Sequence, residues 1–406
     1  MQIEKIIKIF FKNIISSVSG GSDSLALSII TQKYCDKNKI PHFSIIIDHN
    51  VRENSSKEAI LVSKRLTKLN ISSRILKINN IPPKRGIQNW CRINRFSLLS
   101  KVAREEVGII LLGHHLDDQI ETVLMRLHHS SSLNGLSGIR KEVTFNGIMF
   151  YRPFLDIKKS QIINYCKSNS LTYVNDKSNY DNKFERVRIR NFIKNSSLIK
   201  LEKKILSLKN SSEKICTSLK NYVNLWIKKY VKITYPLYVK INFFEFNNLN
   251  SLIKEFILNE IFQNLGSVGY LPKKKSILRL IENISFRNVR TLSGCKIIPK
   301  AKDILIIREY GRRENYCKKI KKDQIITFDE RWLMRSNHDG YVKIQNINDK
   351  FFLKKFSFLP KEVLSLIPVL VTLDDSLIHP YLIFNTNGIY NKNIISIKSD
   401  FLIWSK

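Results

Sequence analysis

The first 150 residues alternate between short apolar runs and longer stretches in which apolar positions recur every three or four residues. The runs predict strands at 14–18, 43–47, 75–78 and 109–112. The longer stretches predict helices at 25–34, 56–69, 87–105 and from about 117. In the helix at 56–69, the residues predicted to face inward are Ile60, Leu61, Leu66 and Leu69. Strands that alternate with crossover helices are typical of a parallel sheet covered on both faces. We therefore predict an α/β, Rossmann-like fold whose ligands lie beyond the carboxyl ends of the strands.

After about residue 196 the pattern changes. Long amphipathic helices are predicted, with a Lys-rich face and apolar positions at Leu201, Ile205, Leu208, Ile215, Leu219, Tyr222 and Trp226. The basic segment 312–322 is expected to be a linker or loop, and alternating patterns at 341–344, 351–358 and 369–373 predict strands beyond it. These observations divide the chain into an α/β catalytic domain (1–196), a helical middle domain (197–315) and a small C-terminal α+β domain (316–406).

The composition is strongly basic, with 69 Lys and Arg against 34 Asp and Glu and a net charge of +35. Such a field attracts polyanions, above all nucleic acid, although the richness in Ile, Lys and Asn is equally typical of codon bias. No apolar run approaches the roughly 18–20 residues of a membrane-spanning helix, so we expect a soluble protein with no membrane partner. The six cysteines form no C-x-x-C pair, which argues against a zinc site and fits a reducing cytoplasm.

A glycine- and serine-rich hexapeptide follows the first predicted strand and precedes a helix. It consists of Ser19, Gly20, Gly21, Ser22, Asp23 and Ser24. Glycines allow close backbone approach to a ligand, and free amides at a helix N-terminus attract phosphate. No G-x-x-x-x-G-K-[ST] sequence is present, so this is not a Walker A loop. Taken alone, such a hexapeptide is also compatible with an ordinary turn.

A second polar motif, GHHLDDQIET, begins at Gly113, directly after the strand predicted at 109–112. A helix from about residue 117 places Asp117, Asp118 and Glu121 near one another in its first turns. Carboxylates at a strand end can bind Mg²⁺, hold a cationic amine or accept a proton. Helix capping is the alternative, and it explains one or two acidic groups but not the adjacent His114 and His115 as well.

Three further features support a site for nucleotide and nucleic acid. Asp48 ends the second strand, where the base or ribose of a nucleotide would lie, although a lone Asp-His after a strand more often forms a turn. On the helix before the acidic motif, Arg92 and Arg95 could pair with phosphates or carboxylates, or form surface salt bridges, and Arg92 is taken as the candidate ligand. In an extended segment, Arg186, Arg188 and Arg190 would line one face and suit a phosphate backbone, the alternative being a charge-protected edge.

The hexapeptide SGGSDS resembles the pyrophosphate loop of the N-type ATP pyrophosphatases, which split ATP into AMP and pyrophosphate. SGGSDS, IDHNVR, NWCRINRF, GHHLDDQIET, NGLSGI, RPFLD, DKSN and RVRIRN also occur in the order and spacing typical of the tRNA(Ile)-lysidine synthase family. The resemblance covers residues 14 to about 195, is looser in the middle of the chain, and is only general in the C-terminal 90 residues.

The resemblance implies a ligase of the PP-loop fold that uses ATP and Mg²⁺. Such an enzyme joins free L-lysine to C2 of the wobble cytidine in the CAU-anticodon tRNA(Ile), through an adenylated base, and changes codon specificity from AUG to AUA. The implied catalytic residues are Asp23, His114, Asp117, Asp118 and Glu121. The implied ATP-binding residues are Ser19, Gly20, Gly21, Ser22, Asp23, Ser24, Asp48, Arg92 and Gly113. Mg²⁺ is assigned to Asp23 and Asp118, and tRNA to Arg186, Arg188 and Arg190.

This sequence departs from the family pattern at three places. The family's R-G-S-G segment reads His129-Ser130-Ser131-Ser132, Leu112 replaces a Thr, and Val187 replaces an Asn. Two other functions are compatible with the scaffold. One is a PP-loop tRNA thiolase, but no cysteine follows the acidic motif until Cys166. The other is a non-catalytic basic RNA-binding protein. The sequence leaves open the oligomeric state, including a homodimer.

Overall fold

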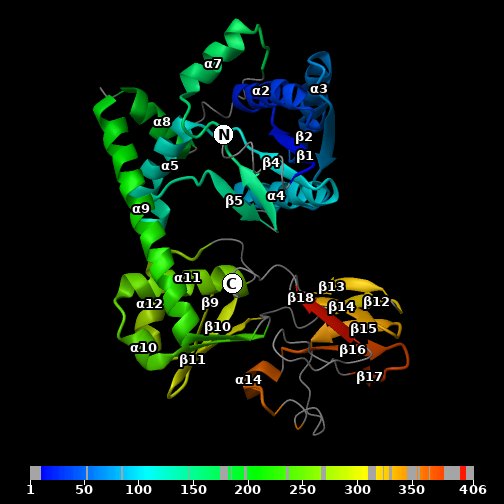
Figure 1. Cartoon of the computed structure of the whole chain (residues 1–406), viewed down its shortest axis with the longest axis vertical. Coiled ribbons are helices and arrows are strands. Elements are labelled where there is room, and N and C mark those ends of the chain that lie inside the picture. The colour runs from blue at the N-terminus through cyan, green and yellow to red at the C-terminus, as the bar shows by residue number, and fades with distance from the viewer. Residues whose placement is uncertain are drawn as a thin grey trace. The chain divides into compact units, whose positions relative to one another are not determined.

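The structure of the chain is a computed structural model (Figure 1). It describes residues 11–51, 54–83, 86–145, 147–173, 182–183, 185–195, 199–234, 237–266, 271–309, 317–322, 324–328, 332–344, 354, 357–364, 366–378 and 394–398. Contacts divide the chain into two compact units, Met1–Cys216 and Thr217–Lys406. The division falls inside a single long helix, α9 (Ile199–Tyr230). The domain boundaries drawn at 196 and 315 stay a prediction.

Unit 1 is built on a six-stranded sheet of order β3-β2-β1-β4-β6-β5. The strands are β1 (Asn13–Val18), β2 (His42–Asp48), β3 (Ser73–Lys77), β4 (Gly108–Leu111), β5 (Glu142–Phe145) and β6 (Ile148–Tyr151). Strands β1, β2, β3, β4 and β6 pair in parallel, and β5 pairs antiparallel with β6. The helices are α2 (Ser22–Asn38), α3 (Ser55–Lys68), α4 (Ile87–Glu105), α5 (Leu116–His128), α6 (Leu133–Leu136), α7 (Lys159–Ser168) and α8 (Glu185–Asn195). The predicted α/β fold is confirmed.

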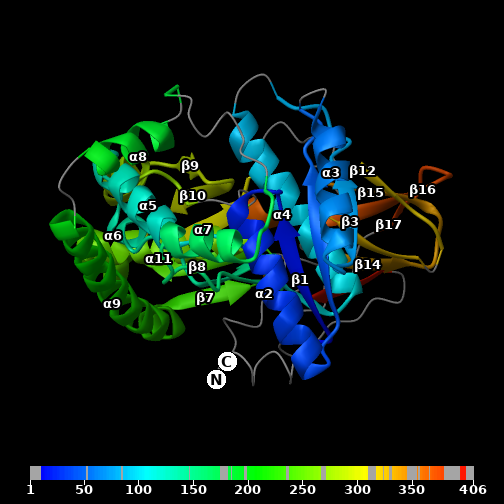
Figure 2. The same ribbon diagram turned by 90° about the horizontal axis from the view of Figure 1, so that it is seen from above.

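Alternate residues of β1 serve opposite cores, as the two-residue period of a strand requires. Ile14 packs with residues of α2 and α7, whereas Ile15 packs with Phe96 and Leu99 of α4. Helix α3 contacts β2 and β3 and shares a core with α2. Figure 2 shows α2 and α3 on one face of the sheet and α4 on the other. The sheet is therefore buried on both faces.

Strand β1 lies between β2 and β4, and the strands that follow along the chain lie in opposite directions: β2 is on one side of β1, whereas β5 and β6 are beyond β4 on the other. This is a topological switch point, where loops at the carboxyl ends of neighbouring strands diverge and leave a crevice. The loop after β1 carries Ser19–Ser24 and the loop after β4 carries Gly113–His115. The fold thus brings together the two motifs that the sequence places about 90 residues apart.

Two predictions about unit 1 are wrong. In α3, Ile60 and Leu61 are 48% and 53% exposed, and Ala59, Val62 and Leu66 form the buried face. Leu69, also predicted to face inward, lies after the helix and is 37% exposed. The segment with Arg186, Arg188 and Arg190 is helix α8 rather than an extended row, so the three arginines cannot all share one face.

The predicted helical middle region is confirmed for α9, α10 (Phe243–Asn247), α11 (Ser251–Leu265) and α12 (Lys274–Ser285). Within α9, Ile205, Val223 and Trp226 are buried, whereas the predicted inward residues Leu208, Ile215 and Tyr222 are exposed. Unit 2 also contains an antiparallel sheet of order β7-β8-β11-β10-β9, which was not predicted from the sequence. Its strands are β7 (Val231–Thr234), β8 (Tyr238–Asn242), β9 (Arg290–Leu292), β10 (Cys295–Pro299) and β11 (Asp303–Arg308).

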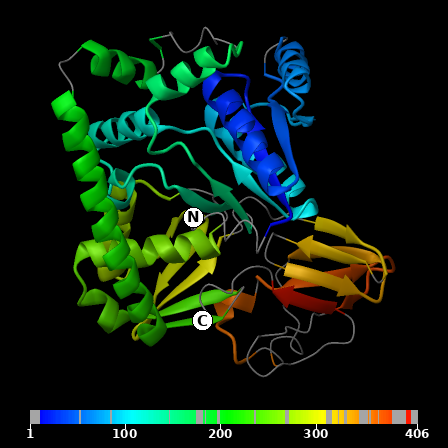
Figure 3. The same cartoon turned by 45° about the horizontal axis from the view of Figure 1, so that its top comes forward.

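The C-terminal region of unit 2 forms two antiparallel sheets, ordered β12-β15-β16-β17 and β13-β14-β18, shown in yellow to red in Figure 3. The elements are β12 (Cys317–Ile320), β13 (Ile325–Phe328), β14 (Trp332–Ser336), β15 (Gly340–Ile344), α14 (Lys361–Leu364), β16 (Pro368–Thr372), β17 (Leu377–Ile378) and β18 (Ile394–Lys398). Strands β15 and β16 confirm two predicted strands, and β12 lies in the segment expected to be a linker. Most of the strand predicted at 351–358 lies outside the described residues. No helix in the described ranges is long and apolar enough to cross a membrane.

Candidate active site

The glycine-serine loop joins β1 to α2 and is held by its own side chains. Gly20 has φ +89°, a left-handed conformation that favours glycine, and α2 begins at Ser22. The hydroxyl of Ser24 accepts a hydrogen bond from the backbone N–H of Ser19 at 3.1 Å and donates to the carbonyl of Gly21 at 3.2 Å. The hydroxyls of Ser19 and Ser24 also lie 3.2 Å apart. The loop is therefore shaped in advance, with the start of α2 at its base.

Gly113, after β4, lies against the backbone of this loop. A Cβ at position 113 would lie 3.1 Å from the carbonyl carbon of Asp23 and from the backbone nitrogen of Ser24. These contacts are with backbone atoms, which cannot rotate away as a flexible side chain can. Glycine at 113 therefore allows the loop after β4 and the glycine-serine loop to pack this closely.

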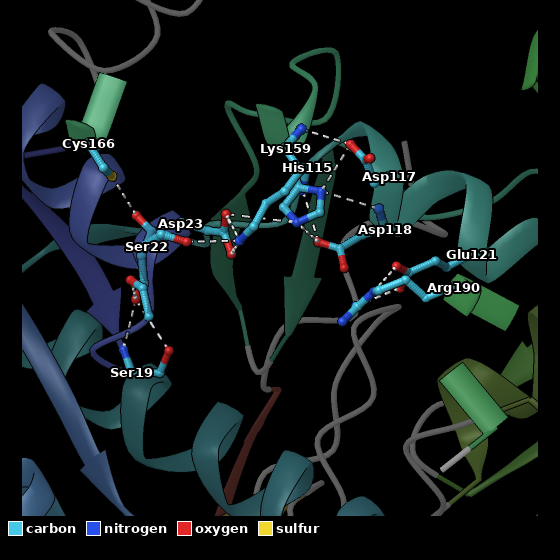
Figure 4. A network of polar contacts seen from close by, with 12 residues as sticks. Ser19, Ser22, Asp23, His115, Asp117, Asp118, Glu121, Lys159, Cys166 and Arg190 are labelled. Carbon is cyan, nitrogen blue, oxygen red and sulfur yellow. Dashed lines mark hydrogen bonds and ion pairs between the residues drawn. The ribbon is translucent and has the colours of Figure 1, made fainter. Parts of the chain in front are cut away.

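His115 lies at the centre of the acidic motif and is not among the site residues predicted from the sequence. It is 5% exposed and precedes α5, where its Nδ1 accepts the backbone N–H of Asp118 at 3.3 Å. The other nitrogen of the ring, Nε2, faces two carboxylates. That Nε2 lies 3.8 Å from Oδ1 of Asp23 and 3.6 Å from Oδ2 of Asp118 (Figure 4). His115 thus connects the loop after β1 with the acidic motif after β4.

Asp118 completes a capping box with His115, because its Oδ2 accepts the backbone N–H of His115 at 3.0 Å. Its other oxygen lies 3.2 Å from Nη2 of Arg186. Burial alone would raise the pKa of Asp118, but the charges of His115 and Arg186 outweigh burial and lower it below its ordinary value. Capping, the structural alternative to catalysis, therefore explains one of the three acidic residues.

Glu121 is 2% exposed and is held by two arginines of α8. Its Oε2 accepts from Nε of Arg186 at 2.8 Å, and its Oε1 accepts from Nε of Arg190 at 2.7 Å. Arg188, between them in sequence, instead donates to the carbonyls of Asn182 and Lys183. Two of the three arginines predicted to bind tRNA thus contact the acidic motif.

Lys159, the first residue of α7, reaches the glycine-serine loop and was not predicted from the sequence to belong to the site. Its Nζ lies 2.5 Å from both carboxylate oxygens of Asp23 and 2.9 Å from the hydroxyl of Ser22. Its backbone N–H donates to Oδ2 of Asp117 at 2.8 Å. No sequence signal singles out this lysine, because it lies more than 130 positions from the loop and has Lys158 beside it.

A cavity of about 450 Å³ opens beside these motifs. It is lined by Ser19, Gly21, Asp23, Ser24, Asp48, His49, Arg95, Gly113 and His114, among others. Arg95 is among its lining residues and Arg92 is not, although the guanidiniums of both lie over the ring of Phe96, at 5.7 and 5.3 Å from its centroid. The buried Nδ1 atoms of His49 and His114 and Nε of Arg95 have no hydrogen-bond partner within the described part of the chain. Unpartnered polar atoms on a cavity wall fit a polar ligand of nucleotide size.

Comparison with known proteins identifies the family. Residues 2–197 match the PP-loop domain family. The chain is 30% identical to the tRNA(Ile)-lysidine synthase of Wolbachia pipientis wMel over 80% of each chain. It is 27% identical to that of Rickettsia typhi over 92% of this chain and 90% of the relative. The chain belongs to the tRNA(Ile)-lysidine synthase family.

The predicted function and enzyme class are therefore confirmed: the chain is a lysidine synthase of the ligase class, with an ATP-utilising PP-loop domain. Among solved structures, it is similar to the U34-tRNA thiolase NcsA from Methanococcus maripaludis with its [4Fe-4S] cluster. That similarity has a TM-score of 0.43 and 18% identity, and it covers 52% of this chain and 77% of that one.

One departure from the lysidine synthase pattern has a visible structural effect. Ser130, in the place of a family glycine, has φ +48° in the left-handed region. A residue with a Cβ is strained there, at a cost of roughly 1 kcal/mol. Ser132, in the place of the other glycine, instead accepts the backbone N–H of Gly135 at 3.4 Å and caps α6. The substitutions thus strain one position and supply a cap at the other.

Proposed function

We propose that this lysidine synthase joins free L-lysine to C2 of the wobble cytidine of the CAU-anticodon tRNA(Ile), at the expense of ATP, in the cytoplasm. The supporting observation is that the glycine-serine loop, which would hold the phosphates and is called the phosphate loop below, lies next to the acidic motif at the switch point. His115 Nε2 lies 3.8 Å from Asp23, and Lys159 contacts Asp23 through its ammonium and Asp117 through its backbone. A nucleotide on the loop would therefore have its α-phosphate near the groups that receive the base and the amine.

In the proposed first step, O2 of cytidine attacks the α-phosphorus of ATP and pyrophosphate leaves. The loop hydroxyls and the free amides at the start of α2 would hold the phosphates and stabilise charge that develops in the transition state. Asp48 ends β2 on the cavity wall and accepts from the Ser55 hydroxyl at 2.7 Å and the Asn50 backbone N–H at 2.9 Å. Burial alone would raise the pKa of Asp48, but a hydrogen bond from Ser56 together with these two bonds outweighs burial and lowers the pKa, so the group is ionised.

Mg²⁺ fits this site through Asp23. The described residues contain no group of three or more His, Cys, Asp or Glu side chains that could hold a metal ion. Mg²⁺ is commonly bound by one or two carboxylates and by substrate phosphates, so one carboxylate beside the phosphate loop is sufficient. Asp118, the second predicted ligand, has both oxygens within reach of His115 and Arg186. Both oxygens of Asp23 contact the Lys159 ammonium, which would have to leave the carboxylate for Mg²⁺ to bind there. When bound, Mg²⁺ would offset the charge of the phosphates.

In the proposed second step, the ε-amine of lysine attacks C2 and AMP leaves. Asp117, with a side chain 44% exposed, is the accessible carboxylate of the motif and suits a cationic amine. Glu121 has its oxygens engaged by Arg186 and Arg190, so we assign it the placement of α8 beside the amine site. Burial lowers the pKa of His114 to about 3, so His114 acts as a neutral imidazole on the cavity wall.

The deciding experiment is mass spectrometry of the wobble nucleoside after incubation with the CAU-anticodon tRNA(Ile), ATP and isotope-labelled lysine. We expect lysidine that carries the label, with AMP and pyrophosphate formed in equal amounts. Asp23→Asn should abolish AMP formation and leave tRNA affinity within about twofold. A sulfur-containing nucleoside would support the thiolase alternative, and tRNA binding without pyrophosphate release would support a non-catalytic RNA-binding protein.

A further inference from the structure

We propose that Lys159 is the cation that holds the leaving pyrophosphate during adenylation. The inference rests on the proposed function in one respect, the cleavage of ATP between its α- and β-phosphates. It names a residue outside the glycine-serine loop and outside the acidic motif.

The geometry places the Lys159 ammonium on the phosphate loop from a separate element. Its Nζ contacts Asp23 and Ser22, the first two residues of α2 (Figure 4). Its backbone is fixed by the hydrogen bond to Asp117, so the side chain starts from a defined point. The Lys159 side chain is 32% exposed and that of Asp23 is 25% exposed, so both reach solvent and a ligand. The ammonium can therefore move between the carboxylate and a phosphate by rotation of its flexible stem.

The loop has no basic side chain of its own. The loop itself contains backbone amides, hydroxyls and one carboxylate, but no lysine or arginine. A Walker A loop carries a lysine that reaches the β- and γ-phosphates, and this loop lacks it. A triphosphate placed beside an unpaired Asp23 would experience repulsion, which is large at short range in a partly buried site. Lys159 removes that repulsion and supplies the donor that the loop lacks.

The proposed step balances without an added proton. O2 of cytidine forms a bond to the α-phosphorus as the bond to the bridging oxygen breaks, and the electron pair leaves with pyrophosphate. Charge therefore accumulates on the phosphates that leave. An ammonium hydrogen-bonded to those oxygens stabilises the transition state more than the bound ATP.

The test measures ligand binding without tRNA or lysine, so that it does not depend on lysidine formation. Inorganic pyrophosphate and AMP are titrated separately into the full-length protein by calorimetry. Lys159→Met should weaken pyrophosphate binding about 10- to 100-fold and AMP binding less than threefold, because AMP lacks the outer phosphates. Lys159→Arg should recover most of the pyrophosphate affinity, because it keeps the charge.

Lys158→Met is the matched control. Lys158 precedes Lys159, and its Nζ lies 3.0 Å from Glu202 rather than on the loop. We expect both ligands to bind this variant as they bind the unaltered protein. Equal loss of AMP and pyrophosphate binding in Lys159→Met, or unchanged binding of both, would overturn the proposal.

A double variant separates phosphate contact from neutralisation of Asp23. In Asp23→Asn with Lys159→Met, no charge on Asp23 needs compensation. Direct contact predicts that pyrophosphate binding stays weak, whereas recovery to normal affinity would show that Lys159 acts only as the counter-ion of Asp23. Urea unfolding of each variant, compared with the unaltered protein, shows whether a loss of binding reflects a loss of fold.

Discussion

Glu121→Gln should loosen α8 from α5, because it removes the charge that two arginines share. The Glu121 carboxylate is 2% exposed, and it bonds Arg186 at 2.8 Å and Arg190 at 2.7 Å. Removing one partner of a fully buried ion pair costs about 3–5 kcal/mol. Here the arginine side chains are 41% and 34% exposed, so water solvates them in part. We therefore expect about 1–3 kcal/mol of local destabilisation.

Hydrogen exchange of the backbone amides measures this local opening. Amides of 185–195 should exchange about 5- to 150-fold faster in Glu121→Gln, since 1.4 kcal/mol corresponds to about tenfold. Amides of α2 serve as the internal reference and should not change. Glu202→Gln is the matched control, because Glu202 forms an ion pair with the half-exposed Lys158 and its loss should cost under about 1 kcal/mol.

A double-mutant cycle with Arg190→Gln tests whether the contact itself carries the effect. Residues in direct contact show coupling of about 0.5–3 kcal/mol, whereas independent residues add within about 0.5 kcal/mol. Additive effects, or unchanged exchange in α8, would refute the assigned role of Glu121. Glu121→Gln should also displace Arg186 from Asp118, and we therefore expect it to impair lysine transfer more than adenylation. Equal losses in the two half-reactions would contradict that expectation.

Three further predictions address the loop, the pH dependence and the tRNA surface. Gly113→Ala should weaken ATP binding about tenfold, because its Cβ would press on the Asp23 and Ser24 backbone at 3.1 Å; unchanged affinity in calorimetry would show that the loop yields freely. Burial lowers the pKa of His42 from 6.5 to about 4, so between these pH values the unfolded chain is protonated at His42 and the folded chain is not. The free energy of unfolding should therefore fall by roughly 3 kcal/mol as the pH drops from 6.5 toward 4. Urea unfolding of His42→Asn should therefore depend less on pH across that window, and an identical profile would contradict this assignment. Replacing Lys203, Lys204 and Lys214 of α9 with Gln should make the salt dependence of tRNA binding shallower by about two to three in log–log slope, whereas an unchanged slope would favour codon bias.

The sequence by itself determined the fold of unit 1 and the two motifs at its switch point. Both depend on local signals: apolar periodicity marks strands and helices, and glycines, hydroxyls and carboxylates mark the strand ends. The same local signals misplaced the inner face of α3. Residues 59–62 are all apolar, so two different faces of the helix show apolar residues at a spacing of three or four. The neighbouring sheet selected Ala59 and Val62.

Only the tertiary structure decided which charges meet. Lys159 reaches Asp23 across 136 positions, and Arg190 reaches Glu121 across 69. No periodicity reports contacts at such separations, because they depend on how α7 and α8 return to the sheet. The segment RVRIRN lies in helix α8. Helical spacing puts Arg186 and Arg190 beside the Glu121 carboxylate and points Arg188 elsewhere. The alternation of Arg with apolar residues predicted a strand, but in the structure the buried Glu121 carboxylate accepts hydrogen bonds from two arginines four positions apart on a helix.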